Sequence, residues 1–179
     1  MIFFKLNIVL IGFRGTGKST VGKILSEQTG LKFISTDDEI ERANGKISEI
    51  VRANGWGYFR ELESRAIEYI VREEIDNAVI ATGGGAVMNS KNVQNLKKNG
   101  KFFLLIADKE RIISRIRDSD RPSLTSECIE NEAWKILNER LPTYLSTADY
   151  IIDTTNLTPK ETAEKIKEIM KKLSAKNDS

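Results

Sequence analysis

The strongest chemical signal in the sequence is a glycine-rich segment at residues 12–19, with the letters GFRGTGKS. It matches the pattern GxxxxGK[ST], and it lies between an apolar run typical of a strand and a segment with the apolar spacing of a helix. Glycines allow such a loop to wrap its N–H groups around a phosphate, and the helix that follows adds the positive end of its dipole. We therefore predict a cradle for the phosphates of ATP, in which Lys18 reaches the β- and γ-phosphates and the Ser19 hydroxyl ligates Mg²⁺. The predicted nucleotide-binding residues of this loop are Gly12, Gly15, Thr16, Gly17, Lys18, Ser19 and Thr20.

Polar or glycine-rich segments also follow the second and third apolar runs of the sequence. The carboxyl ends of parallel strands are where α/β sheets bind ligands, so we expect these segments to contribute to one site. Further along the chain, two arginines stand in a polar segment and near the end of the helical segment after it. The candidates are Asp37, Arg60, Gly83, Gly84, Gly85, Arg121 and Arg140.

Each of these candidates also has a plain structural interpretation. Arg60 and Glu63 are three residues apart, which suits an ordinary exposed ion pair on a helix. Asp37 or Asp38 could cap the helix that follows. The triple glycine could be a simple turn, and Arg121 a solvated loop charge. Taken one at a time, the candidates leave these alternatives open.

Composition excludes several classes of chemistry. The chain has 179 residues with 28 basic and 26 acidic side chains, so its net charge of +2 does not favour nucleic acid as a partner. It has no histidine, which excludes His-dependent triads and His-ligated zinc, and its single cysteine, Cys128, excludes an intrachain disulfide. No run approaches the ~20 apolar residues of a membrane span. We expect a cytoplasmic monomer.

Short apolar runs alternate with segments of helical spacing along the whole chain. Strands are predicted at residues 6–11, 32–34, 78–81, 101–106 and 150–153, with helices at 18–28, through most of 40–72, at 93–98, up to 117, and at 129–144 and 161–173. This alternation favours a three-layer α/β fold, in which a five-stranded parallel sheet carries helices on both faces. We predict one P-loop kinase domain over residues 1–179. The size and the lack of an NKxD guanine signature favour a small-molecule kinase over a GTPase.

Taken together, the loop at 12–19, Thr36-Asp37, the F-R-x-x-E segment at 59–63, the triple glycine and Arg121-Pro122 resemble shikimate kinase. That family belongs to the nucleoside-monophosphate-kinase-like group of P-loop kinases, and the resemblance covers nearly the whole chain. It implies transfer of the ATP γ-phosphate to the 3-hydroxyl of shikimate, on the pathway to chorismate and the aromatic amino acids. It also implies a substrate-binding region at about 35–72 and a lid at about 118–127.

The resemblance assigns a role to each acceptor-site candidate. Asp37 would hold the attacking hydroxyl, and Arg60 and Arg140 would clamp the shikimate carboxylate with planar bidentate donors. Gly83, Gly84 and Gly85 would offer backbone N–H groups to the substrate and to the γ-phosphate. Glu63 would orient Arg60 from one helical turn away.

The resemblance also assigns roles at the nucleotide. Arg121 would move in from the lid to neutralise charge on the transferring phosphate. An arginine shortly before the lid would contact adenine, and the spacing leaves Arg115 and Arg117 both open. Asn156, in the loop after the fifth strand, would complete the adenine site.

One position departs from the family pattern. The family usually shows D-x-D after the second strand, and here Ser35 stands where the first aspartate would support Mg²⁺ through water. We expect Mg²⁺ binding to persist through Ser19 and the phosphates. Two other interpretations stay open: a related small-molecule kinase such as gluconate kinase, and a nucleotide-binding paralogue with impaired catalysis.

Overall fold

The protein is built around a sheet of five parallel strands. The computed structural model describes residues 6–73, 75–117 and 129–177, and in it the strands lie in the order β2-β3-β1-β4-β5. All four strand pairs are parallel. Their bounds are β1 Asn7–Ile11, β2 Lys32–Ser35, β3 Ala78–Ala81, β4 Gly100–Ile106 and β5 Tyr150–Asp153. The predicted five-stranded parallel sheet is therefore confirmed, with strand ends within one residue of the expected ones.

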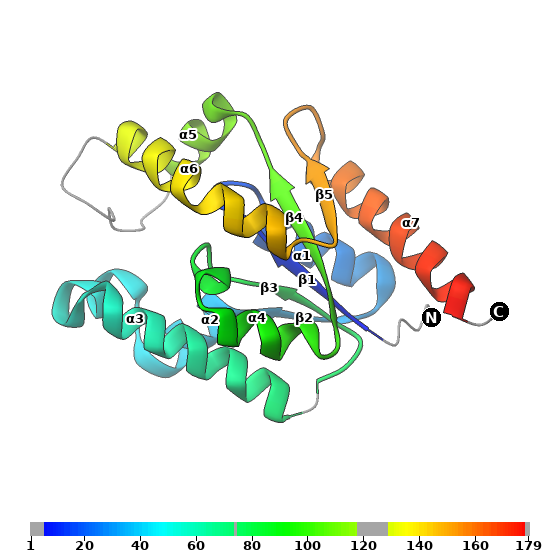
Figure 1. Cartoon of the computed structure of the whole chain (residues 1–179), viewed down its shortest axis with the longest axis horizontal. Helices are drawn as coiled ribbons and strands as arrows, with labels where there is room; N and C mark the ends of the chain where they lie inside the picture. Colours follow the sequence, from blue (N-terminus) through cyan, green and yellow to red (C-terminus); the bar gives the residue numbers. More distant parts are fainter. Residues whose placement is uncertain (1–5, 74, 118–128, 178–179) are drawn as a thin grey trace.

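Helices connect the strands and cover both faces of the sheet (Figure 1). Their bounds are α1 Lys18–Thr29, α2 Thr36–Asn44, α3 Ile47–Arg72, the 3-10 turn η1 Ala86–Met88, α4 Ser90–Lys97, α5 Lys109–Arg117, α6 Ile129–Thr147 and α7 Pro159–Asn177. The predicted helix at 129–144 runs three residues further, past Pro142. The last helix begins two residues earlier than predicted, because proline suits the first helical position.

The alternation of side chains along β1 divides the core into two layers. Ile8 and Leu10 pack with α1 and α7 through residues such as Leu25 and Ile166. The side chain of Val9 points to the opposite face, into a second cluster with α3, α4, α5 and α6. Since successive strand residues face opposite sides, a strand that is buried throughout, as β1 is, requires helices on both sides. The three-layer prediction is confirmed.

The segment between β2 and β3 forms a small unit against the sheet. α2 and α3 share a separate apolar cluster that includes Ile40, Phe59 and Leu62. α3 is broken at Gly55, whose φ of 79° and ψ of 172° are not helical. The kink sets the N-terminal part of α3 at an angle to the rest and places Trp56 beside Phe59, with ring centroids 5.6 Å apart.

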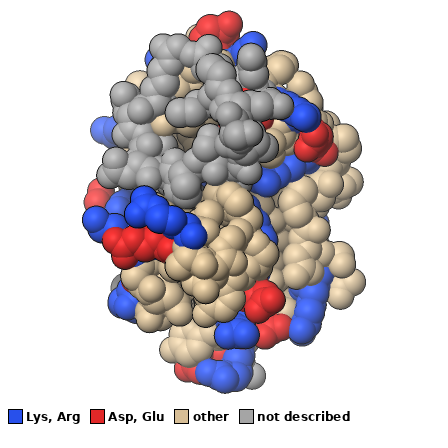
Figure 2. Space-filling view, turned by 90° about the vertical axis from the view of Figure 1, so that its left-hand side faces the viewer, with Lys and Arg blue, Asp and Glu red and all other residues tan. Residues whose placement is uncertain are grey.

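The charges on one face of the molecule agree with the near-neutral net charge of the sequence. Figure 2 shows one face of the molecule, on which basic and acidic side chains are interspersed. Among the described helices, none combines the length and the apolar character needed to cross a membrane. The predicted lid at 118–127, with Arg121, and Cys128 lie outside the described residues.

Candidate active site

The phosphate cradle is the loop between β1 and α1, and its backbone depends on glycine. Gly12, Gly15 and Gly17 have φ values of 135°, 81° and 95°, which side-chain-bearing residues rarely adopt. A Cβ on Gly12 would also collide with the carbonyl oxygen of Leu105. Lys18 begins α1 and folds back into the loop, where its ammonium donates to the carbonyls of Gly12 and Phe13 at 2.7 and 2.8 Å.

A pocket opens directly over this loop. It is lined by Arg14, Gly15, Gly17, Lys18, Ser19, Thr20, Asp37, Thr82, Arg115 and Ile116. Most of the predicted phosphate-binding residues thus share one wall. Gly12 and Thr16 shape the loop from behind, since the Thr16 hydroxyl donates to the Phe13 carbonyl at 2.8 Å.

Arg115 connects the cradle to a second hollow beside it. Its guanidinium donates to the Gly15 carbonyl at 3.0 Å, and its side chain also lines a pocket with Thr154, Leu157 and Pro159. Arg115 and the loop after β5, which are both predicted to contact adenine, therefore meet at one hollow. The side chain of Arg117 lies outside the described residues. Asn156 is exposed and is not among the residues that line this pocket, whose wall is formed by its neighbours on either side.

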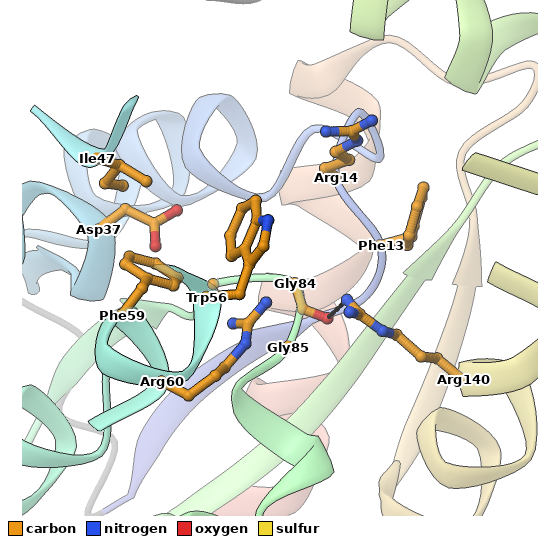
Figure 3. A pocket seen from close by; sticks show the side chains of 11 residues that line it. Phe13, Arg14, Asp37, Ile47, Trp56, Phe59, Arg60, Gly84, Gly85 and Arg140 are labelled. Atoms are coloured by element: carbon orange, nitrogen blue, oxygen red, sulfur yellow. Dashed lines mark hydrogen bonds between the residues drawn. The ribbon is translucent and has the colours of Figure 1, made fainter. Parts of the chain in front are cut away.

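A third pocket adjoins the cradle (Figure 3). It is lined by Phe13, Arg14, Asp37, Ile47, Trp56, Phe59, Arg60, Gly83, Gly84, Gly85 and Arg140. All six predicted acceptor-site residues therefore meet in one cavity, although they come from α2, α3, α6 and the loop after β3. Asp37 and Arg14 line both this pocket and the one over the cradle.

Arg60 and Glu63 form a partly buried ion pair rather than an exposed one, because the Arg60 side chain is 31% exposed. Arg60 donates to Glu63 at 2.8 Å, and the side chain of Glu63 is only 1% exposed. Burial raises the pKa of Glu63 above its usual value; the Arg60 guanidinium opposes the rise, and the Asp37 carboxylate adds to it. The guanidinium of Arg60 also lies 5.1 Å from the ring centroid of Phe59, so aromatic and acidic contacts together fix its direction.

The triple glycine is needed for space rather than for an unusual φ. None of the three residues has a positive φ. A Cβ on Gly83 would collide with the carboxylate of Glu63, and one on Gly85 would collide with the guanidinium of Arg60. The glycine backbone that is predicted to contact a ligand is therefore already in close contact with Arg60 and Glu63 of α3.

Two residues that sequence reasoning did not select hold the triple glycine. Thr36 is fully buried, and its hydroxyl accepts the N–H of Gly83 at 2.9 Å. Tyr144 is 1% exposed, and its hydroxyl donates to the carbonyl of Gly84. Arg140 donates to the same carbonyl at 3.2 Å. The sequence held one signal for Tyr144, because it stands four residues after Arg140 and therefore on the same face of the helix.

The capping interpretation of the acidic pair after β2 is wrong. Ser35 is the N-cap of α2, and its hydroxyl accepts the N–H of Asp38 at 3.2 Å. Serine and aspartate are both good N-caps, so serine at position 35, in place of the aspartate of the family pattern, costs α2 little stability. Asp37 lies in the first helical turn, mostly buried, and its carboxylate points into the acceptor pocket (Figure 3).

A glycine-rich loop that opens a helix next to a parallel sheet places the chain in the P-loop class of nucleotide-binding proteins, and the charged pocket alongside can take a small acceptor. Comparison with known proteins narrows the class. Residues 14–171 match the model of the shikimate kinase family. The chain belongs to this family.

Relatives and solved structures agree with the match. The chain is 43% identical to shikimate kinase of Thermodesulfovibrio yellowstonii over 170 residues, covering 94% of this chain and 96% of that one. It is 44% identical to the enzyme of Caldanaerobacter subterraneus over 162 residues, covering 89% and 93%. Its fold matches shikimate kinase of Acinetobacter baumannii in complex with shikimate, with a TM-score of 0.87, 35% identity, and 96% and 94% of the two chains covered.

Proposed function

We propose that this protein transfers the γ-phosphate of ATP to the 3-hydroxyl of shikimate, giving ADP and shikimate 3-phosphate on the pathway to the aromatic amino acids. The observation that carries the proposal is the position of Asp37, which lines both the pocket over the cradle and the acceptor pocket. A hydroxyl bound beside this carboxylate is adjacent to the γ-phosphate. Phosphoryl transfer depends mainly on such positioning, together with neutralisation of the phosphate charge.

The donor half of the site holds the phosphates. Backbone N–H groups of the loop and the start of α1 face the phosphates, and Lys18 moves from the loop carbonyls to the β- and γ-oxygens. Lys18 is 8% exposed, so its charge acts in a poorly solvated place, where it stabilises the transition state strongly.

The residues of the phosphate pocket also fit Mg²⁺. Ser19, Asp37 and Thr82 bring oxygen atoms to its wall, and Mg²⁺ prefers oxygen ligands. Within residues 6–73, 75–117 and 129–177 there is no cluster of three or more acidic, cysteine or histidine side chains. This suits an ion that uses one or two protein oxygens and completes its shell with water and phosphate. Ser19 would be the ligand, and the bound ion would offset charge on the phosphate oxygens.

The acceptor half recognises an anionic polyol. Arg60 and Arg140 approach the glycine backbone from opposite sides (Figure 3), and two guanidinium groups suit a carboxylate that must be held in one orientation. Asp37 accepts hydrogen bonds from the hydroxyls, and Phe59 and Trp56 cover the apolar part of the ring. The acceptor pocket thus distinguishes a carboxylate end from a hydroxyl end.

Other parts of the proposal concern the whole chain. We infer one domain over residues 1–179, with 35–72 as the substrate-binding region and 118–127 as a lid that carries Arg121. We also infer a monomer in the cytoplasm; a sedimentation measurement and cell fractionation test these two points.

The test of the activity is ADP release in a coupled assay with a panel of hydroxy acids. The proposal predicts ADP release that requires shikimate and saturates with it. Release with gluconate but not shikimate would favour a related polyol-acid kinase. Nucleotide binding without turnover on any acceptor would favour a paralogue with impaired catalysis.

A further inference from the structure

The three glycines after β3 present six backbone polar groups, and most of them are already bonded. The carbonyl of Gly83 accepts the N–H of Ala86 at 3.2 Å, and the carbonyl of Gly85 accepts that of Met88 at 3.0 Å. The N–H of Gly83 donates to the Thr36 hydroxyl, and the carbonyl of Gly84 accepts from Arg140 and Tyr144 of α6. The N–H groups of Gly84 and Gly85 have no acceptor among the residues that the structure describes. Gly85 is buried and Gly84 half-buried. Buried backbone donors are nearly always bonded, so these two N–H groups are the ones available to a ligand.

The direction of the Gly85 N–H is set by what bonds the Gly84 carbonyl. Both groups belong to one peptide unit, and a trans peptide is planar with its C=O and N–H pointing in opposite directions. The structure contains no cis peptide among its described residues. A carbonyl held toward α6 therefore sends the Gly85 N–H away from α6, to the side where Arg60 lies against Gly85.

The group that holds the carbonyl most firmly is the hydroxyl of Tyr144. Its ring is among the largest fully buried side chains and packs in the core cluster of α3, α4 and α6, so the hydroxyl has little freedom. Burial raises the pKa of Tyr144 to about 12, and the hydroxyl therefore keeps its proton and remains a donor at physiological pH. Arg140, the other donor to this carbonyl, is half-buried and, on the proposed function, must also serve the substrate.

We propose that Tyr144 is a positioning residue for the acceptor: by donating to the Gly84 carbonyl it aims the Gly85 N–H into the acceptor pocket and leaves Arg140 able to bind the substrate carboxylate. Thr36 has the corresponding role on the other side, because its hydrogen bond with the Gly83 N–H fixes the first residue of the triple glycine. Thr36 therefore holds the triple glycine from α2, and Tyr144 holds it from α6. This inference rests on the proposed function for the identity of the acceptor, but not for the direction of the peptide.

The first test is Tyr144→Phe in the full chain. The ring and its packing stay, and only the hydroxyl is lost. We expect the KM for shikimate to rise about five- to tenfold, which corresponds to ~1–1.4 kcal/mol, while the KM for ATP changes less than twofold. The matched control is Tyr150→Phe, because Tyr150 stacks on Phe103 and lines none of the three pockets of the site. A loss of packing alone would lower thermal stability without separating the two KM values.

The second test observes the peptide directly. The chain has 12 glycines, so protein labelled with ¹⁵N-glycine gives a small set of amide NMR signals to assign. We expect Tyr144→Phe to shift the Gly85 signal before any ligand is added, and to reduce its response to shikimate. An unmoved Gly85 signal, or a shikimate KM within twofold of wild type, would overturn the positioning role.

A third pair of variants keeps the test decisive if Tyr144→Phe is too unstable to measure. Thr36→Val removes the acceptor of the Gly83 N–H with little change in shape, and Thr36→Ser keeps it. We expect the valine variant to raise the shikimate KM several-fold and the serine variant to restore it. Equal shikimate KM values for the valine and serine variants would refute the idea that hydrogen bonds hold the triple glycine. If wild type itself shows no shikimate-dependent turnover, the proposed function fails, while the glycine spectra without ligand still decide the orientation.

Discussion

The phosphate cradle and the acceptor pocket lie side by side, but the chain builds them in different ways. The cradle is one continuous segment between β1 and α1, and three of its glycines adopt a positive φ. The acceptor pocket is assembled from α2, α3, α6 and the loop after β3, and its glycines have ordinary φ values. The first is therefore defined by local backbone conformation, and the second by packing between distant elements. Substitutions in the two regions should fail in different ways.

The largest effect is expected in the cradle. Lys18→Ala removes the buried cation that faces the transferring phosphate, and kcat should fall by roughly a hundred- to a thousandfold. Steady-state kinetics measure this, with Lys23→Ala as the control, since Lys23 is exposed on the same helix. A kcat within tenfold of wild type would mean that the cradle contributes binding but little catalysis.

The next effect belongs to the acceptor pocket. Arg60→Ala removes a charge-assisted partner of the substrate carboxylate, so the shikimate KM should rise about thirty- to a hundredfold, equivalent to ~2–3 kcal/mol. The ATP KM should stay within a few-fold of wild type. Arg65→Ala, an exposed arginine on the same helix, is the matched control. If only the ATP KM rose, Arg60 would serve the nucleotide rather than the substrate carboxylate, which would contradict its assignment to the acceptor pocket.

A pair of glycine substitutions tests the contrast between the regions most sharply. Gly17→Ala meets no atom closer than 3.9 Å but must adopt a φ of 95°, so it should cost about 1–2 kcal/mol of stability and lower the melting temperature by several degrees. Gly85→Ala has a φ of −110°, so stability should change little. Its Cβ falls on the Arg60 guanidinium, however, and should raise the shikimate KM about tenfold.

Gly57→Ala serves as the reference for both substitutions, because a Cβ there meets nothing within 4 Å and needs no positive φ. Equal losses of stability from Gly17→Ala and Gly85→Ala would contradict the distinction between the two kinds of glycine.

The smallest effect concerns the charge beneath the acceptor pocket. The pKa of Glu63 is raised by burial, so the folded protein holds that proton more tightly than the unfolded chain does, and the free energy of unfolding falls as the pH rises from about 4.5 through the raised pKa. Glu63→Gln removes the titrating carboxyl group and with it this fall in the free energy of unfolding. The variant should therefore gain thermal stability relative to wild type as the pH increases toward neutral, and the two should converge at acid pH.

Thermal melts of Glu63→Gln and wild type across pH 4 to 8 measure the effect, with Glu61→Gln, an exposed acid on the same helix, as the control. The glutamine should also weaken shikimate binding, because it no longer attracts the Arg60 guanidinium as a carboxylate does. A difference in stability that does not depend on pH would contradict the role given to burial.

The same contrast explains how far the sequence could be read. The cradle was predictable residue by residue because its pattern is contiguous and each glycine follows from local geometry. The sheet was predictable because buried strands alternate with helices. Arg60, Arg140 and the triple glycine could be selected as candidates, but their contacts depend on how α3 and α6 pack. The roles of Thr36 and Tyr144 could not be predicted for that reason. The sequence places Tyr144 on the same helix face as Arg140, but it does not show that the glycine backbone lies against Tyr144 or Thr36.

The adenine side shows the same limit. Spacing leaves Arg115 and Arg117 both open as the adenine contact. The structure places Arg115 against Gly15, and the side chain of Arg117 lies outside the described residues. Ser35 departs from the family pattern, and its place as the cap of α2 depends on where the helix begins. A distant contact thus places Arg115, whereas the local start of α2 places Ser35.

The two pockets meet at Asp37, and a single substitution there shows whether this carboxylate holds the reacting hydroxyl. Asp37→Asn keeps the size of the side chain and removes its charge. Calorimetric titration with ATP and with shikimate, together with kcat from the coupled assay, should show both ligands bound within a few-fold of wild type and kcat reduced by at least about a hundredfold. A kcat close to wild type with both ligands bound would contradict the account, because the reacting hydroxyl would then be held elsewhere.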